Sequence, residues 1–191
     1  MASPNHTNLN EVDWSQLPVP ESDGRASHLE GMTLPPVSLP STSGEVVDLS
    51  QLRGTAVVFA YPMTGRPDVA LPHGWDMIPG ARGCTPQACA FRDIHQELRK
   101  AGADYLFGLS VQSTNYQKEA ADRLHLPFPL LSDELVLLRT TLDLPVMEVD
   151  GVTLLKRLTM ICVDGKIEKV FYPVFPPDQN PADVQNWLKS R

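Results

Sequence analysis

Two apolar runs along the chain predict strands that are buried on both faces. Residues 55–61 (TAVVFAY) are almost uniformly apolar and rich in β-forming side chains, and residues 104–111 show a similar run. Between them, apolar residues from Cys84 to about Lys100 fall on one face at helical spacing, and Gly102 marks the expected end of that helix. A strand, a helix and a second strand are therefore expected in succession.

Shorter elements flank this unit. Residues 34–39 predict a strand at a sheet edge, where their two prolines are tolerated, and residues 45–49 predict a second strand after a Ser-Gly turn. These two strands are expected to form an N-terminal β-hairpin. A helix is expected at 114–124 and a short one at 134–142.

Two Asp-Gly pairs predict tight turns between strands in the C-terminal part of the chain. The pairs at 150–151 and 164–165 are hairpin signals, which bracket a strand expected at 152–163 and lead into another at 166–171. An Asn-Pro pair is expected to open a last helix over 180–189.

This order of elements predicts an α/β protein with a thioredoxin-like fold, in which helices flank a central mixed sheet. The 191 residues are enough for one domain with a full core. Residues 1–30 carry scattered polar residues and prolines, so we expect an N-terminal arm or extension there and the domain over 31–191.

Composition and net charge indicate which partners and cellular locations are expected. The net charge of -7 and pI of about 5.1 argue against nucleic acid or an anionic membrane as a partner. No apolar run approaches the roughly 20 residues of a membrane span, and the polar N-terminus does not resemble a signal peptide. Three cysteines do not suggest a disulfide framework, so a reducing, cytoplasmic location is expected.

The candidate chemistry lies in the segment GCTPQACAFRD, which contains Cys84 and Cys89. Cys84 follows a glycine and opens a predicted helix, where free backbone N–H groups and the helix dipole favour a thiolate. A thiolate that attacks a peroxide becomes a sulfenic acid, and a second thiol can condense with it to a disulfide. Cys89 is the obvious second thiol.

Helix geometry constrains that disulfide. Five residues along a helix rise about 7.5 Å and turn about 500°, which exceeds the roughly 7 Å Cα separation that a disulfide allows. A redox-active pair therefore requires the first helical turn to unwind. The alternative is that both cysteines are inert core residues, which is the interpretation we favour for Cys162, in a buried strand. Zinc is disfavoured because Cys-x4-Cys supplies two ligands and no histidine lies at zinc-ligand spacing from the pair.

Arg157 directly precedes the apolar run that contains Cys162. An arginine at a strand end could reach a neighbouring thiolate and stabilise charge that develops on a peroxide oxygen. On the sequence alone, a solvated surface arginine is an equal alternative.

At these residues the chain resembles the peroxiredoxins, most closely the Q-type (bacterioferritin-comigratory) group, over about residues 31–188. The matching segments are, in order, LSQLRG, YP, GCT with AC and FRD, GLS, PFPLLSD and VDGKI. The resemblance implies a thiol peroxidase of thioredoxin fold that uses no metal, haem or other cofactor. It implies that Cys84 is the peroxidatic residue, Cys89 the resolving one, Arg157 the active-site arginine and Pro62 the proline that opens the active-site loop. It also implies thioredoxin or a similar dithiol protein as reductant, and leaves a monomer or a homodimer open.

One segment departs from the family pattern Pro-x-x-x-Thr-x-x-Cys. Ala81 stands where the threonine is expected, and Pro62 lies 22 residues before Cys84, so the chain carries an insertion. Thr64 or Thr85 could supply the missing hydroxyl. The insertion over 63–83 is too rich in glycine and proline for regular structure, and loops of this length tend to be functional or disordered.

The insertion also carries Trp75 and Ile78, which could form an apolar wall or a dimer contact that reshapes substrate access. Two other functions remain open on the same fold. A thiol–disulfide reductase usually shows Cys-x-x-Cys rather than Cys-x4-Cys. A redox sensor with little peroxidase turnover would accommodate the absent threonine, because such a site oxidises slowly and signals instead.

Overall fold

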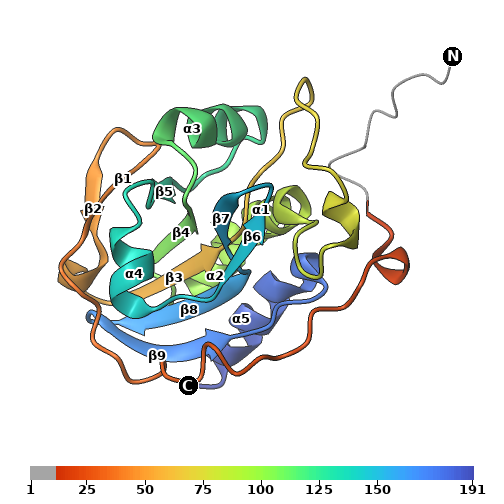
Figure 1. The fold of residues 1–191 in the computed structure, drawn as a ribbon. Helices are drawn as coiled ribbons and strands as arrows, with labels where there is room; N and C mark the ends of the chain where they lie inside the picture. Colours follow the sequence, from red (N-terminus) through yellow and green to blue (C-terminus); the bar gives the residue numbers. More distant parts are fainter. Residues whose placement is uncertain (1–11) are drawn as a thin grey trace, which may run out of the picture.

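A five-stranded mixed sheet forms the centre of the computed structural model, which describes residues 12–191 (Figure 1). In spatial order its strands are β5 (Leu130–Ser132), β4 (Tyr105–Ser110), β3 (Thr55–Ala60), β8 (Leu158–Val163) and β9 (Lys166–Phe171). The β3–β4 and β4–β5 pairs are parallel, and β3–β8 and β8–β9 are antiparallel. All six residues of β3 are buried, which confirms the prediction of a central strand there.

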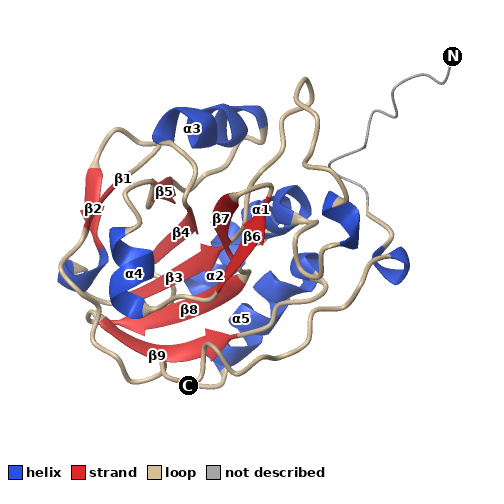
Figure 2. Cartoon of the chain, viewed as in Figure 1, coloured by secondary structure: helices blue, strands red, loops and turns tan. Residues whose placement is uncertain are grey.

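Helices cover both faces of this sheet (Figure 2). They are α1 (Cys84–Asp93), α2 (His95–Lys100), α3 (Thr114–Arg123), α4 (Leu137–Leu142) and α5 (Asn180–Lys189). One core layer joins the sheet to α1, α2 and α5, and the other joins it to α4 and the N-terminal segment. Alternate residues of β8 divide between these layers, with Ile161 on the side of α1 and Cys162 on the side of α4. The expected α/β, thioredoxin-like architecture is thus confirmed.

No helix within 12–191 has the length and apolarity to cross a membrane.

Two short hairpins lie outside the central sheet. Strands β1 (Ser38–Pro40) and β2 (Val46–Asp48) form the expected N-terminal hairpin, and β6 (Val146–Val149) and β7 (Val152–Leu155) form another. Single 3₁₀ turns are η1 (Trp14–Gln16), η2 (Leu49–Gln51), η3 (Trp75–Met77) and η4 (Pro177–Gln179).

Four of the predicted elements differ clearly from the structure. The helix expected from Cys84 to Lys100 is broken at Ile94, whose φ of -111° and ψ of 20° leave the helical region. Phe91 and Leu98 stay in the same core layer across the break, so the apolar spacing could not reveal it. The strand expected at 152–163 is two strands, because β7 pairs with β6 whereas β8 pairs with β3 and β9.

The strand predicted at 34–39 covers only Ser38–Pro40, since the two prolines before it cannot donate to a ladder. The helix expected at 134–142 begins at Leu137, and β5 was not predicted.

The N-terminal segment packs along the domain rather than away from it. Ala26 and Leu29 are buried in the core layer with α4. Asp23 accepts hydrogen bonds from Lys156 Nζ at 2.8 Å and from the Tyr172 hydroxyl at 2.8 Å. The first part of the predicted arm, residues 1–11, lies outside the described residues, and the domain boundary near residue 30 stays a prediction.

Candidate active site

Cys84 is the first residue of α1, as the sequence predicts, and its side chain is almost completely buried. Gly83 before it has a φ of 111°, a conformation that favours glycine. A Cβ at Gly83 would also lie 2.8 Å from both Trp14 and Pro177. Glycine is therefore required twice, by its backbone angle and by the close packing that fixes the start of the helix. Cys84 and Thr85 begin the helix, so their backbone N–H groups have no intrahelical partner, and such groups favour negative charge nearby.

Arg157 lies in the connection between β7 and β8 and points at Cys84. Its Nη2 is 3.2 Å from the Cys84 Sγ, and the same nitrogen lies 3.1 Å from the carbonyl oxygen of Ala81. Only 3% of the arginine is exposed. The surface alternative for Arg157 is therefore wrong, and a guanidinium faces the sulfur in a site from which most water is excluded.

A buried hydrogen-bond chain holds this arginine. Arg157 Nη1 donates to Gln87 Oε1 at 2.5 Å, and Gln87 Nε2 donates to Asn180 Oδ1 at 3.1 Å. The Thr159 hydroxyl donates to the same Asn180 oxygen at 2.7 Å. Asn180 is the first residue of α5, where the sequence analysis expected the Asn-Pro pair to open the last helix. Its hydrogen bonds in this chain, and the roles of Gln87 and Thr159, were not predicted from the sequence. The one available signal was polar side chains at positions that face the core.

Cys89 lies in the same helix, one turn and a half beyond Cys84, and both thiols are free. Cys89 is partly buried among the apolar residues that line α1. Burial raises the pKa of the Cys89 thiol; the charge on Arg92 opposes this shift and that on Asp93 adds to it. The thiol thus keeps its proton while the helix is intact.

Cys162 is buried in β8 on the opposite face of the sheet from Cys84. Burial raises its pKa to about 12. Its predicted place in the core is confirmed, and the sheet separates it from the other two cysteines.

A small hollow opens above Cys84. Its lining residues are Met63, Gly65, Leu71, Trp75, Arg82, Gly83, Cys84, Thr85 and Pro86, and its free volume is about 10 Å³. That is about the room that one water molecule needs. Pro62, predicted to open the loop, is buried two residues after the end of β3, and Met63 and Gly65 beyond it line the hollow.

The two candidate hydroxyls differ in their surroundings. Thr85 lines the hollow beside Cys84. The Thr64 hydroxyl instead lies 3.3 Å from Gln112 Oε1, which also accepts the Thr64 N–H at 3.0 Å. Ala81 is fully buried and faces the site with its carbonyl group. Thr85 is therefore the better placed of the two.

The insertion is irregular, as predicted, but it is anchored at both ends. At its start, the carbonyl oxygen of Gly65 accepts a hydrogen bond from Arg123 of α3 at 2.9 Å, and Arg66 lies over the ring of Tyr116. Near its end, Arg82 pairs with Asp76 at 2.8 Å. The segment therefore forms an ordered wall around Cys84.

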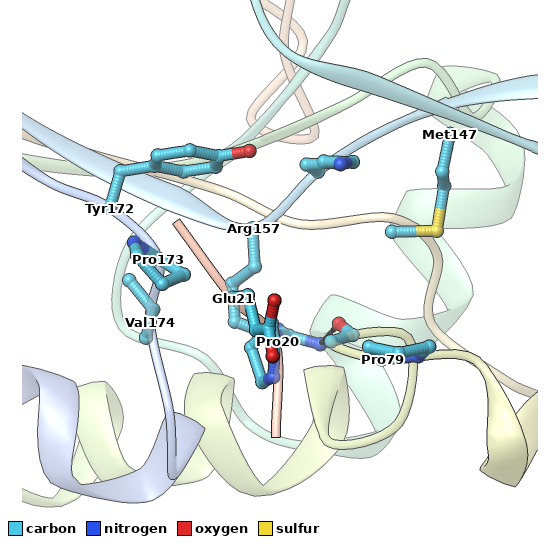
Figure 3. A pocket seen from close by; sticks show the side chains of 10 residues that line it. Pro20, Glu21, Pro79, Met147, Arg157, Tyr172, Pro173 and Val174 are labelled. Atoms are coloured by element: carbon cyan, nitrogen blue, oxygen red, sulfur yellow. Dashed lines mark hydrogen bonds between the residues drawn. The ribbon is translucent and has the colours of Figure 1, made fainter. Parts of the chain in front are cut away.

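A second hollow lies beside Arg157, between the N-terminal segment and the loop after β9 (Figure 3). It has about 80 Å³ of free volume and is lined by Pro20, Glu21, Pro79, Gly80, Met147, Lys156, Arg157, Tyr172, Pro173 and Val174. Lys156 and Arg157 of the connection between β7 and β8 both line this second hollow. Residues 12–191 contain no cluster of three or more His, Cys, Asp or Glu side chains that could hold a metal ion.

Comparisons with known proteins agree with this geometry. The family model described as Redoxin matches residues 29–188. Peroxiredoxin Bcp of Escherichia coli is 35% identical over 172 residues, which cover 83% of this chain and 94% of the relative. The chloroplastic peroxiredoxin Q of Sedum lineare is 32% identical over 162 residues, which cover 84% of this chain and 78% of the relative.

Solved structures show the same fold. Peroxidoxin BcpB of Mycobacterium tuberculosis superposes with a TM-score of 0.66 at 25% identity and covers 85% of this chain and 98% of its own. A mutant of PrxQ from Xylella fastidiosa superposes with a TM-score of 0.69 at 20% identity and covers 85% of this chain and 97% of its own.

Proposed function

This chain belongs to the peroxiredoxins of the Q type and is a thiol-dependent peroxidase, and on that premise we propose that Cys84 is the residue that attacks the peroxide. The main observation behind this proposal is that Arg157 Nη2 lies 3.2 Å from the Cys84 Sγ, at the start of α1. Cys162 lies instead in the core layer on the other face of the sheet, and burial raises its pKa to about 12.

In the first step, the Cys84 thiolate attacks one peroxide oxygen and the O–O bond breaks. A sulfenic acid forms at Cys84, and the other oxygen leaves as an alkoxide or hydroxide that takes up a proton. Arg157 supports this step because its charge stabilises the thiolate and the charge that develops on the leaving oxygen. Thr85 is the hydroxyl we propose for hydrogen bonding to the peroxide.

In the second step, the Cys89 sulfur attacks the Cys84 sulfur, an S–S bond forms and water leaves. The intact helix holds the two residues too far apart for this bond, so the first turn of α1 unwinds before it forms. A dithiol protein such as thioredoxin then reduces the disulfide by exchange and returns both thiols. We further propose that the protein works in the cytoplasm, as a monomer or a homodimer.

The second candidate function is a redox sensor with little turnover. Ala81 favours it, because it puts a methyl group where the family pattern has a hydroxyl that would bind the peroxide. Both functions begin with oxidation of Cys84, but in the sensor this oxidation is slow and little peroxide is turned over.

Thioredoxin-coupled consumption of hydrogen peroxide separates these functions, measured for the wild type, Cys84→Ser, Cys89→Ser and Cys162→Ser. We expect turnover by the wild type and Cys162→Ser, none by Cys84→Ser, and a single oxidation by Cys89→Ser. Full turnover by Cys84→Ser would refute the proposed role of Cys84. A wild type that reacts no faster than a free thiol would favour the sensor.

A further inference from the structure

Two hollows share a wall at Trp75. The inner hollow contains Cys84, and an outer one of about 210 Å³ is lined by Leu71, Pro72, Gly74, Trp75, Asp76 and Met77. Leu71 and Trp75 line both. These two side chains therefore stand between a space of about 10 Å³ at the sulfur and one about 20 times larger beside it.

Trp75 is held firmly in this position. Only 4% of it is exposed, and it packs in a small core with Ala81, Val149 and Leu154. Because Val149 and Leu154 belong to the β6–β7 hairpin, the insertion is packed onto a separate part of the fold. A side chain buried in this way is part of the wall of the site and is not available for a dimer contact.

The backbone around Trp75 is also fixed. Its N–H donates to the carbonyl oxygen of Pro72 at 3.1 Å, and its own carbonyl oxygen accepts from Ile78 at 3.2 Å. The ion pair of Asp76 with Arg82 joins the same 3₁₀ turn to the residue just before Gly83. This ion pair thus links the turn that contains Trp75 to the start of α1.

From these observations we infer that Trp75 determines substrate size, by closing the Cys84 hollow to hydroperoxides that carry a bulky apolar group. With the wall in place, the inner hollow has room for a molecule close to the size of water, which suits hydrogen peroxide. Removing the wall would join the hollows, and Leu71, Pro72 and Met77 would then offer an apolar surface to an organic substituent. The inference rests on the proposed role of Cys84.

The experiment compares kcat/KM for cumene hydroperoxide with kcat/KM for hydrogen peroxide, with dithiothreitol as reductant. Trp75→Ala removes the larger of the two side chains between the hollows. Leu71→Ala removes the other one, and because Leu71 is only partly buried, this change should destabilise the fold less. Val69→Ala is the matched control, since Val69 is an exposed residue of the same insertion that lines neither hollow. We expect the ratio to rise at least about tenfold in Trp75→Ala and to a smaller extent in Leu71→Ala, with no change in the control.

An unchanged ratio in Leu71→Ala and in a folded Trp75→Ala would overturn the inference. Should Trp75→Ala fail to fold, as judged by circular dichroism, Leu71→Ala and Trp75→Leu decide in its place. Failure of the proposed function shows separately, because peroxide consumption would then persist when Cys84→Ser is added to each variant.

Discussion

At the residue scale, one chain of hydrogen bonds connects the sulfur to the C-terminal helix. It runs from Cys84 through Arg157 and Gln87 to Asn180, where the Thr159 hydroxyl also donates. Every member is almost completely buried, so each hydrogen bond acts in a medium of low dielectric constant. The guanidinium is therefore fixed in position before a peroxide arrives.

Replacing Arg157 tests this arrangement. Arg157→Lys keeps the charge but cannot contact Gln87 and Cys84 together, because lysine lacks the planar fork of donors. Losing a hydrogen bond to a charged group costs about 1.5–3 kcal/mol, so we expect the rate constant for peroxide attack to fall by about 10–100-fold. Stopped-flow kinetics of the reduced protein measures this. Lys156→Ala is the control, since Lys156 pairs with Asp23; an equal loss there would contradict the assignment.

Because burial raises the pKa of Cys162, the protein is expected to become less stable as the pH rises in the alkaline range. The folded protein keeps the thiol protonated until about pH 12, whereas the unfolded chain loses this proton near the ordinary value of 9.0. The unfolded state is thus favoured as the pH rises from about 9 to 12, by about 1.4 kcal/mol for each unit of pKa difference. Urea unfolding of the reduced protein should show this decline, and Cys162→Val should show less of it. Parallel curves for the two proteins would be evidence against the raised pKa.

At the element scale, α1 performs two tasks that conflict. In the proposed mechanism, its intact first turn presents Cys84 to the peroxide, and the same turn keeps Cys84 too far from Cys89 for a disulfide. The N-terminal segment adds to this conflict, because Trp14 packs on Gly83 and donates from Nε1 to Asp178 at 2.9 Å. Residues far apart in the sequence therefore stabilise the turn that, in the proposed mechanism, unwinds before the disulfide forms.

Unwinding of α1 predicts a change in amide exchange. One equivalent of peroxide should increase hydrogen exchange at the backbone of residues 84–88 in the wild type, because the disulfide is incompatible with the helix. Cys89→Ser, which forms no such bond, is expected to keep the protection of the reduced protein. A disulfide between Cys84 and Cys89 with α1 still protected would disprove the requirement for unwinding.

Loosening the packing on α1 should speed the second step. Trp14→Ala removes the contact with Gly83 and the hydrogen bond to Asp178, and if about 1.4 kcal/mol of support for the folded turn is lost, disulfide formation becomes about tenfold faster. Trp14→Phe keeps an aromatic ring there and should have a smaller effect. Rapid quench and mass measurement follow this step, and an unchanged rate in Trp14→Ala would show that the contact does not restrain the turn.

At the scale of the whole molecule, the central strands of the sheet are predicted well because β3 and β4 are mostly apolar and buried. Asp-Gly pairs also mark the tight turns of both late hairpins. The break at Ile94 was missed because Phe91 and Leu98 keep the apolar spacing across it. The split between β7 and β8 was missed because it depends on which strand each of them pairs with. The same limit applies to the site. Cys84 and Cys89 are conspicuous in the sequence, whereas Gln87 and Asn180 act only once the fold brings α1 and α5 together.

Mapping the disulfide of the oxidised protein tests most directly whether Cys84 and Cys89 act as the two catalytic cysteines. The reduced wild type would be treated with one equivalent of hydrogen peroxide, blocked with an alkylating reagent and digested for mass spectrometry. We expect one intramolecular bond, between Cys84 and Cys89, with Cys162 recovered as the alkylated thiol. A bond that includes Cys162, or oxidation at Cys89 while Cys84 stays reduced, would contradict the two-cysteine peroxidase.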